Sequence, residues 1–247
     1  MMGRLLLAGM LAGLVAGLLS FGFLKLAGEP SVARAIAFEQ TKEKANDSAG
    51  AAEPELVSRR VQSGAGLLIG VAVYGVALGG LFALGFALAY RRMGDLGPRA
   101  TAAILAALGF VSVHLIPALK YPAAPPAVGA AETIGSRTSL YFAFLLISLA
   151  AMIAAGALRL RLAEPFGGLR AALVAAAAYV AVMACVALAM PHVDETPQDF
   201  PADLLWRFRA ASLAGLALMW AALGLAFGFA AGRLFAREGD PFRAKFR

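Results

Sequence analysis

The chain has 247 residues, of which 61% are hydrophobic and 15% charged, with a formal net charge of +7 and a mean hydropathy of +0.77. Soluble domains carry about 45–50% apolar and about 25% charged residues, so this composition excludes an ordinary soluble globular protein. The basic residues lie at the ends of apolar runs instead of forming one face, which argues against nucleic-acid binding. The single cysteine, Cys185, excludes a disulfide framework and a thiolate metal cluster.

Six apolar stretches have the length of roughly 20 residues that a transmembrane helix needs. They cover about residues 5–27, 67–90, 100–119, 140–158, 169–190 and 210–231. The first exceeds the core of a signal peptide, and no A-x-A cleavage site follows it before Glu29-Pro30, so we expect a retained helix. The sequence therefore predicts an all-α polytopic membrane protein, a bundle of six transmembrane helices in a single integral membrane domain over residues 1–247.

Lysine and arginine in short loops indicate the orientation, because cytoplasmic loops carry an excess of them. With a cytoplasmic N-terminus, the inner segments hold twelve positive charges and the two short outer loops hold four. We therefore expect both termini to be cytoplasmic. Outside the spans, the composition predicts a short helix on the membrane surface over residues 31–40. It also predicts a flexible outer linker over residues 41–55 and a basic cytoplasmic tail over residues 232–247.

Glycine recurs at every fourth position in three of the predicted helices. These residues are Gly9, Gly13 and Gly17 in the first helix, Gly75 and Gly79 in the second, and Gly224, Gly228 and Gly232 in the sixth. Small residues at this spacing let helix backbones approach closely where lipid provides no hydrophobic force for association. The pattern predicts interhelical packing without identifying the pairs. The alternative is that glycine is simply frequent in membrane helices.

The two histidines and several acids are predicted to lie on the outer side. His114 is near the outer end of the third helix, and His192 follows the fifth. An ionisable residue within a span is a functional candidate by default, the alternative being a neutral imidazole bonded to a neighbouring helix. Imidazole and carboxylate groups suit cobalt, nickel or zinc. The candidate metal ligands are His114, His192, Asp194, Glu195, Asp199 and Glu29, and the alternative is a solvated acidic loop.

Missing motifs narrow the function further. The chain has neither a G-x-x-x-x-G-K-[ST] phosphate loop nor a G-x-S-x-G nucleophile elbow, so we do not expect an enzyme. A less favoured alternative is an intramembrane enzyme acting on a lipid-linked group through Asp194, Glu195 and Arg137. Tyr121 and Trp206 are suited to anchoring the chain at the membrane interface. The few polar residues within the helices, which include Ser20, Thr101, Ser112, Ser148, Tyr74 and Tyr179, indicate that an oligomer or a partner helix completes any pore.

Several loop motifs are distinctive: V-S-R-R-V-Q-S-G-A-G-L, L-K-Y-P-A-A-P-P-A-V-G, E-T-I-G-S-R-T and D-E-T-P-Q-D-F-P-A-D-L-L-W-R-F-R-A-A-S-L. Together with the glycine-rich helices, they resemble the CbtA family of predicted cobalt-transporter subunits over about residues 3–232. The resemblance implies a multi-pass protein of the bacterial inner membrane that works in cobalt uptake for cobalamin biosynthesis. It also implies a small CbtB partner with one membrane span and a histidine-rich motif. It supplies no ligand residues.

These observations lead to one functional hypothesis and one runner-up. The first is a membrane subunit of a Co²⁺ uptake transporter, with the metal captured at the outer acidic and histidine-bearing face and no permanently bound cofactor. The expected partners are membrane lipid, a CbtB-like subunit and further copies of the chain. The runner-up is a scaffold that transports nothing itself and assembles a metal-transport partner.

Overall fold

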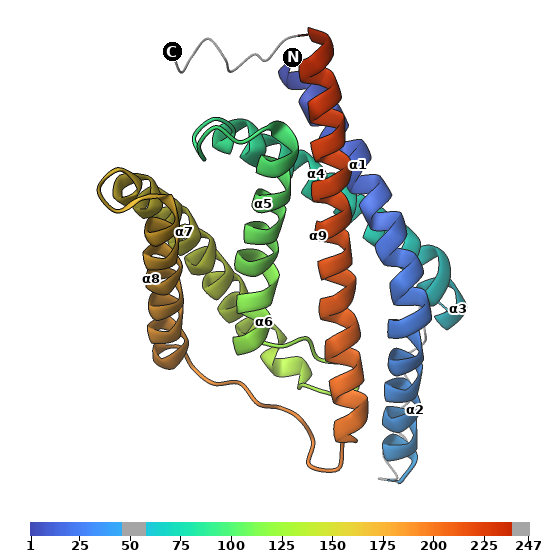
Figure 1. Cartoon of the computed structure of the whole chain (residues 1–247). Helices are drawn as coiled ribbons and strands as arrows, with labels where there is room; N and C mark the ends of the chain where they lie inside the picture. Colours follow the sequence, from blue (N-terminus) through green and yellow to red (C-terminus); the bar gives the residue numbers. More distant parts are fainter. Residues whose placement is uncertain (46–57, 239–247) are drawn as a thin grey trace. The chain divides into compact units, whose positions relative to one another are not determined.

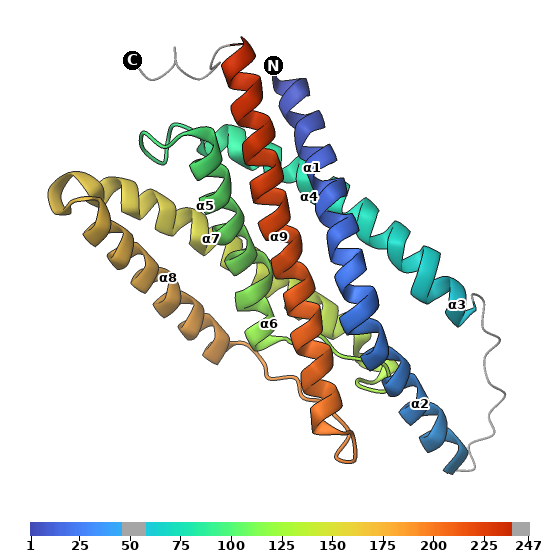
Figure 2. The same cartoon turned by 45° about the vertical axis from the view of Figure 1, so that its right-hand side comes forward.

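The computed structural model describes residues 1–45 and 58–238, and within these ranges the chain is helical and contains no strand (Figures 1 and 2). Among the described residues, six helical stretches are long and apolar enough to cross a membrane. They are Met2–Lys42, Arg59–Ala89, Pro98–Lys120, Ala131–Phe166, Gly168–Ala189 and Ala202–Arg237. Each predicted apolar stretch falls on one of them to within a residue. The predicted all-α fold with six membrane-spanning helices is confirmed.

Several of these stretches combine more than one helical element. The first contains α1 (Met2–Phe23), the π-helix η1 (Leu24–Gly28) and α2 (Glu29–Ala45). The second contains α3 (Arg59–Val61), the π-helix η2 (Gln62–Gly66) and α4 (Leu67–Ala89). The third contains α5 (Pro98–Phe110), the π-helix η3 (Val111–Leu115) and α6 (Ile116–Lys120). The remaining elements are the 3-10 helix η4 (Ala131–Thr133), α7 (Ile134–Phe166), α8 (Gly168–Ala189) and α9 (Ala202–Glu238).

Five of the six helical stretches are longer than the apolar stretches that predict them, the exception being Gly168–Ala189. The backbone stays helical at Leu24 and Glu29, so α2 continues α1 and residues 31–40 do not form a separate surface helix. Residues 41–45 of the predicted linker continue α2, whereas its remainder lies outside the described residues. Residues 232–238 of the predicted tail complete α9, and residues 239–247 are likewise not described. The apolar pattern thus located the spans and underestimated their lengths.

The chain divides into two compact units. Unit 1 comprises Met1–Ala107, Ala123–Val128 and Pro197–Arg247, and unit 2 comprises Leu108–Pro122 and Gly129–Thr196. Within unit 1, the start of α1 and the end of α9 lie at the same end (Figure 1). This placement agrees with termini on one side of the membrane. That the side is cytoplasmic, and that the whole chain is one domain, stay predictions.

Glycines bring α1 and α4 into backbone contact in unit 1. The close pairs are Gly9 with Gly79, Gly13 with Gly75 and Gly17 with Val71. A Cβ atom added at Gly17 would lie 2.8 Å from the Val71 carbonyl oxygen, and one at Gly9 would lie 2.7 Å from the Ala83 Cβ atom. Both distances are shorter than van der Waals contact, so only glycine permits this approach. The predicted glycine packing is confirmed, and its partner helices are now identified.

Helix α9 packs on α5 through small residues and on α4 through aromatic rings. A Cβ atom at Gly224 would lie 2.5 Å from the Ala106 Cβ atom of α5. The Phe227 ring of α9 meets the Phe82 and Phe86 rings of α4 edge to face, with centroids 5.3 and 4.9 Å apart. Such aromatic pairs contribute about 0.5–1.5 kcal/mol each beyond the area that they bury. Glycines and rings therefore hold four helical stretches of unit 1 together.

Unit 2 is built on an antiparallel pair of helices, α7 and α8. They are joined at Gly167, whose φ of +79° belongs to the left-handed region that glycine enters without a steric penalty. The core of the unit consists of Phe144, Tyr179 and Met183. The Tyr121 ring meets the Phe144 ring edge to face, with centroids 5.9 Å apart. This contact attaches the end of α6 to the helical pair.

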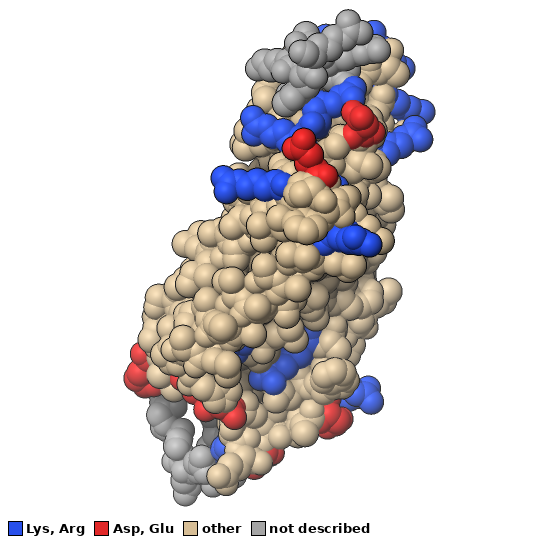
Figure 3. All heavy atoms as spheres, turned by 60° about the vertical axis from the view of Figure 1, so that its left-hand side comes forward, with Lys and Arg blue, Asp and Glu red and all other residues tan. Residues whose placement is uncertain are grey.

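Large apolar side chains point outward along the helices. Leu7 of α1, Leu81 of α4 and Leu225 of α9 are each more than half exposed. Figure 3 shows a broad band without charged residues between the charged helix ends. Soluble monomers rarely expose apolar patches of this extent. The band is the surface that contact with hydrocarbon requires.

We expect Gly13→Ala to lower the melting temperature of the detergent-purified protein. Its methyl group would overlap the Gly75 carbonyl, and overpacking costs about 1–3 kcal/mol. The matched control is Gly22→Ala on the same helix, because no atom lies within 4 Å of a Cβ atom there. Alanine favours helix over glycine by about 1 kcal/mol, so the control should be neutral or stabilising. Equal melting temperatures for the two variants would contradict the packing role of Gly13.

Candidate functional site

The loop that follows α8 is attached to the end of α6 within unit 2. The Lys120 ammonium donates to the Met190 carbonyl at 3.0 Å, and the Tyr121 hydroxyl donates to the Pro191 carbonyl at 2.9 Å. Desolvation raises the pKa of the Tyr121 hydroxyl, so the group remains protonated and able to donate. The two bonds fix the chain just before His192, which is exposed.

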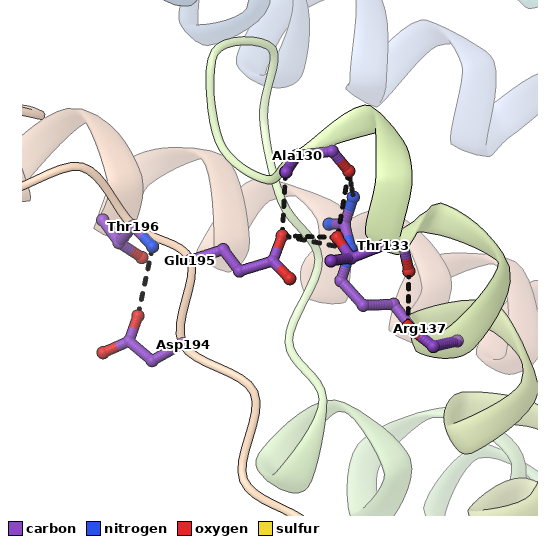
Figure 4. Close-up of polar contacts among 7 residues, drawn as sticks. Ala130, Thr133, Arg137, Asp194, Glu195 and Thr196 are labelled. Atoms are coloured by element: carbon purple, nitrogen blue, oxygen red, sulfur yellow. Dashed lines mark hydrogen bonds and ion pairs between the residues drawn. The ribbon is translucent and has the colours of Figure 1, made fainter.

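Glu195 attaches the other end of this loop to the start of the α7 stretch (Figure 4). Its carboxylate accepts hydrogen bonds from the Ala130 backbone N–H and the Thr133 hydroxyl, each at 2.8 Å. The Arg137 guanidinium lies 3.4 Å away. The Ala130 and Thr133 hydrogen bonds, and then the Arg137 charge, hold the pKa of the carboxyl below its ordinary value of 4.5. We call this group of four residues the Glu195 clamp.

The Glu195 clamp includes a backbone turn that requires glycine. Arg137 also donates to the Ala130 carbonyl at 3.1 Å, and its guanidinium lies against Gly129. Gly129 has a φ of +102°, and a Cβ atom there would collide with the guanidinium. The P-P-A-V-G segment therefore ends in a residue that lets the arginine reach both the turn and Glu195.

Asp194 and His192 take no part in the Glu195 clamp. Asp194 points away from the Glu195 clamp in Figure 4, and one of its oxygens accepts from the Thr196 N–H at 3.2 Å. Both Asp194 and His192 are exposed. Adjacent acids thus have different roles, since Glu195 joins the loop to α7 whereas Asp194 faces outward.

A chain of hydrogen bonds links three helices inside unit 2. The Ser148 hydroxyl of α7 donates to the Ser112 carbonyl of η3 at 2.7 Å and lies 2.8 Å from the Tyr179 hydroxyl of α8. Because the Ser148 proton is used in the first bond, Tyr179 is the donor in the second. His114 lies two residues after Ser112 in the same π-helix and is 7% exposed. Single-turn π-helices occur frequently at functional sites.

Both histidines belong to unit 2 and lie toward the same end of it. His114 precedes Lys120 by six residues, which is about 9 Å of rise along a helix. Lys120 in turn contacts Met190, two residues before His192. The two imidazoles therefore lie toward the same end of unit 2, and their sharing one side of the membrane stays a prediction. The link runs through Lys120 and Tyr121, and the sequence indicated only an interfacial anchoring role for the tyrosine.

The other two predicted ligands, Glu29 and Asp199, lie in unit 1 and are each paired with a cation. Glu29 forms an ion pair with Arg59. Asp199 lies 2.7 Å from the Lys42 ammonium, and this hydrogen bond lowers the pKa of the carboxyl. Within residues 1–45 and 58–238, no three His, Cys, Asp or Glu residues gather as a metal ion would need. The six predicted ligands therefore do not form a single cluster of that size.

Six spanning helices with an uncharged outer band define the chain as a multi-pass membrane protein. The chain belongs to the CbtA family, whose model is described as a probable cobalt transporter subunit and matches residues 2–232. No curated protein and no solved structure matches it. The family assignment inferred from the loop motifs is confirmed.

We expect Glu195→Ala to free the loop of residues 190–196. The variant loses the hydrogen bonds to Ala130 and Thr133 together with the Arg137 contact, so amide deuterium exchange should become faster in this loop and in residues 129–133. Glu132→Ala is the matched control, because it removes an exposed neighbouring carboxylate that takes no part in the Glu195 clamp. Equal exchange in the two variants would show that the clamp does not hold the loop.

The Glu195 clamp should also depend on pH. The carboxyl pKa in the closed loop is lower than its ordinary value of 4.5, so ionised Glu195 favours closure. This contribution is fully present above pH 4.5 and is lost as the pH falls through the lowered pKa. We expect the protection of residues 190–196, corrected for intrinsic exchange rates, to decrease only below pH 4.5. Glu195→Gln should remove this step, and a step of unchanged size in that variant would assign it to another group.

Proposed function

We propose that this CbtA family member is the membrane subunit of a cobalt-uptake transporter that supplies cobalamin biosynthesis, in the bacterial inner membrane. Membership of a transporter-subunit family supports the cobalt-transport part and argues against an enzyme. We place metal capture at the end of unit 2 that carries the loop of residues 190–196. The observation behind this placement is the pair of bonds from Lys120 and Tyr121, which brings His192 to the helix of His114.

Capture begins at His192 and Asp194 in this proposal. Imidazole nitrogen and carboxylate oxygen suit Co²⁺, and both side chains are exposed on one short turn. Glu195, Glu29 and Asp199 are secondary ligands in this proposal, because Glu29 and Asp199 each pair with a cation and Glu195 holds the loop to the α7 stretch. The Glu195 clamp presents the turn, and the two outward residues bind the ion.

A partner or a second copy of the chain completes the coordination. The described residues hold no ready cluster of three His, Cys, Asp or Glu side chains, so His192 and Asp194 alone would bind Co²⁺ weakly. A small one-span, histidine-rich subunit of the CbtB kind would supply the missing imidazoles. The family description as a subunit agrees with such an assembly.

Passage into the membrane then uses His114 and the hydroxyl groups below the loop. An ion must exchange its hydration shell for protein groups to enter a pore. Ser112, Ser148 and Tyr179 form the buried polar chain of unit 2, and Ser112 precedes His114 by two residues. The membrane potential favours inward movement of a cation by about 2.3 kcal/mol per charge per 100 mV. This driving force has the direction that uptake requires.

The second candidate is a scaffold that assembles a transporting partner. The observation in its favour is that residues 1–45 and 58–238 lack a three-ligand cluster. In that case the partner alone binds and conducts cobalt. The two functions differ in whether His192 and His114 contribute to flux once the complex has formed.

We expect His192→Ala and Asp194→Asn to reduce cobalt accumulation in cells that express the protein with its partner. Loss of a metal ligand should cost at least roughly tenfold at low external cobalt, as even outer-sphere changes cost about 10–100-fold. Asp194→Asn keeps an oxygen for the Thr196 N–H, so the turn is preserved. Gln198→Ala is the control, because it alters an exposed polar residue of the same segment.

His114→Ala separates the two candidate functions. A transporting subunit should lose uptake in this variant while still co-purifying with its partner. Wild-type accumulation in His114→Ala, His192→Ala and Asp194→Asn at equal expression would exclude the proposed metal path and favour the scaffold.

A further inference from the structure

A groove of about 480 Å³ lies in unit 1, between the α1–α2 stretch and the beginning of α9. Small-molecule sites commonly have volumes of about 300–1,000 Å³. Its residues come from the end of α1, η1 and the first turns of α2 on one side and from the first four turns of α9 on the other. None of its lining residues belongs to the loop of residues 190–196, and neither histidine is among them.

The groove is apolar at one end and basic at the other. Phe23 and Leu26 line it toward the membrane-crossing part of α1, and Ala214 does so on α9. Arg34 and Arg207 line the other end. The groove therefore suits an amphiphile whose anionic head group contacts the arginines and whose apolar chain contacts the apolar end.

The two arginines are available to a ligand. Within residues 1–45 and 58–238, neither guanidinium forms an ion pair or a hydrogen bond with a protein group. Neighbouring arginines differ, since Arg59 pairs with Glu29 and Arg209 donates to the Ala123 carbonyl at 3.3 Å. Asp203, one helical turn before Arg207, is not among the residues that line the groove.

The basic end of the groove lies at the level of lipid head groups. Arg207 precedes the apolar stretch 210–231 of α9, and Arg34 follows the apolar stretch 5–27 of the first span. Trp206, also in the groove, is 73% exposed, and Leu26 is 81% exposed. Tryptophan is enriched where the hydrocarbon meets the head groups, so the apolar end opens toward the acyl chains.

We propose that this groove is a binding site for an anionic phospholipid. The lipid phosphate lies between the Arg34 and Arg207 guanidiniums, which form paired hydrogen bonds to phosphate oxygens. One acyl chain follows Phe23 and Leu26 toward the bilayer centre. The bound lipid joins the α1–α2 stretch to α9, and this role is independent of whether the protein transports cobalt.

Native mass spectrometry of the full-length protein in detergent tests the proposal, with phosphatidylglycerol and phosphatidylethanolamine of identical acyl chains as probes. Two basic side chains should favour the anionic lipid by about thirtyfold, at the strength typical of a membrane-surface lysine or arginine. The double variant Arg34→Gln/Arg207→Gln should lose this preference. The control Arg92→Gln/Arg237→Gln removes the same charge elsewhere and should keep it.

A groove-filling variant, Ala214→Trp, keeps both arginines and should weaken phosphatidylglycerol binding at least tenfold if the acyl chain occupies the groove. Inorganic phosphate at millimolar concentration should not displace the lipid, and displacement would mean that a free anion is the ligand. A photoreactive residue at position 210 should cross-link to lipid in the membrane. Cross-linking to the helix of a partner protein instead, or equal lipid preference in the two double variants, would overturn the proposal.

Discussion

Two hydrogen bonds, from Lys120 to the Met190 carbonyl and from Tyr121 to the Pro191 carbonyl, decide where the candidate site lies. Met190 and Pro191 directly follow α8, where their carbonyls have no partner within the helix, and Lys120 and Tyr121 at the end of α6 donate to them. The chain therefore leaves α8 along α6 and reaches Glu195, which binds the start of the α7 stretch. Between these attachments lie the exposed residues His192 and Asp194. The site is thus a short exposed turn held at both ends by neighbouring helices.

The sequence predicts the number and approximate position of the spanning helices, because an uninterrupted run of about twenty apolar residues is typical of a helix that crosses the hydrocarbon core. It does not predict how far they continue into water. Helix α2 is polar, and it persists because Ala35 and Phe38 pack against Phe200 and Leu204 near the start of α9. The glycine spacing likewise predicts a contact without predicting the helix on the other side of it. The pattern at Gly9, Gly13 and Gly17 indicates a close helix contact, and only the three-dimensional arrangement shows that α4 is the partner.

The candidate site was predictable to a similar extent. Counting membrane crossings places both histidines on one side, and in unit 2 they lie toward the same end. Counting membrane crossings does not predict which carboxylates bind other parts of the protein and which do not. Asp194 and Glu195 are adjacent in sequence, yet Asp194 accepts from the Thr196 N–H within the loop and Glu195 binds the α7 stretch. The pairing of Asp199 with Lys42 spans 157 positions, and such partners follow from tertiary contacts. Thr133 belongs to the E-T-I-G-S-R-T motif, which gives no indication of its role. In the structure its hydroxyl forms one of the two hydrogen bonds to the Glu195 carboxylate.

Helix α9 has a further consequence for where the protein can function. Its 37 residues correspond to about 55 Å of helix, well above the hydrocarbon thickness of about 30 Å. Arg209 and Arg233 bound its uncharged part and lie about 36 Å apart along the axis. This spacing is matched to one bilayer thickness. In a membrane of another thickness, the helix must tilt or one of the two charges must move toward the acyl chains. Either response costs a fraction of a kcal/mol per Å of mismatch. Acyl-chain length in the host membrane therefore influences the helix on which unit 1 is assembled, against the packing that holds that helix in place.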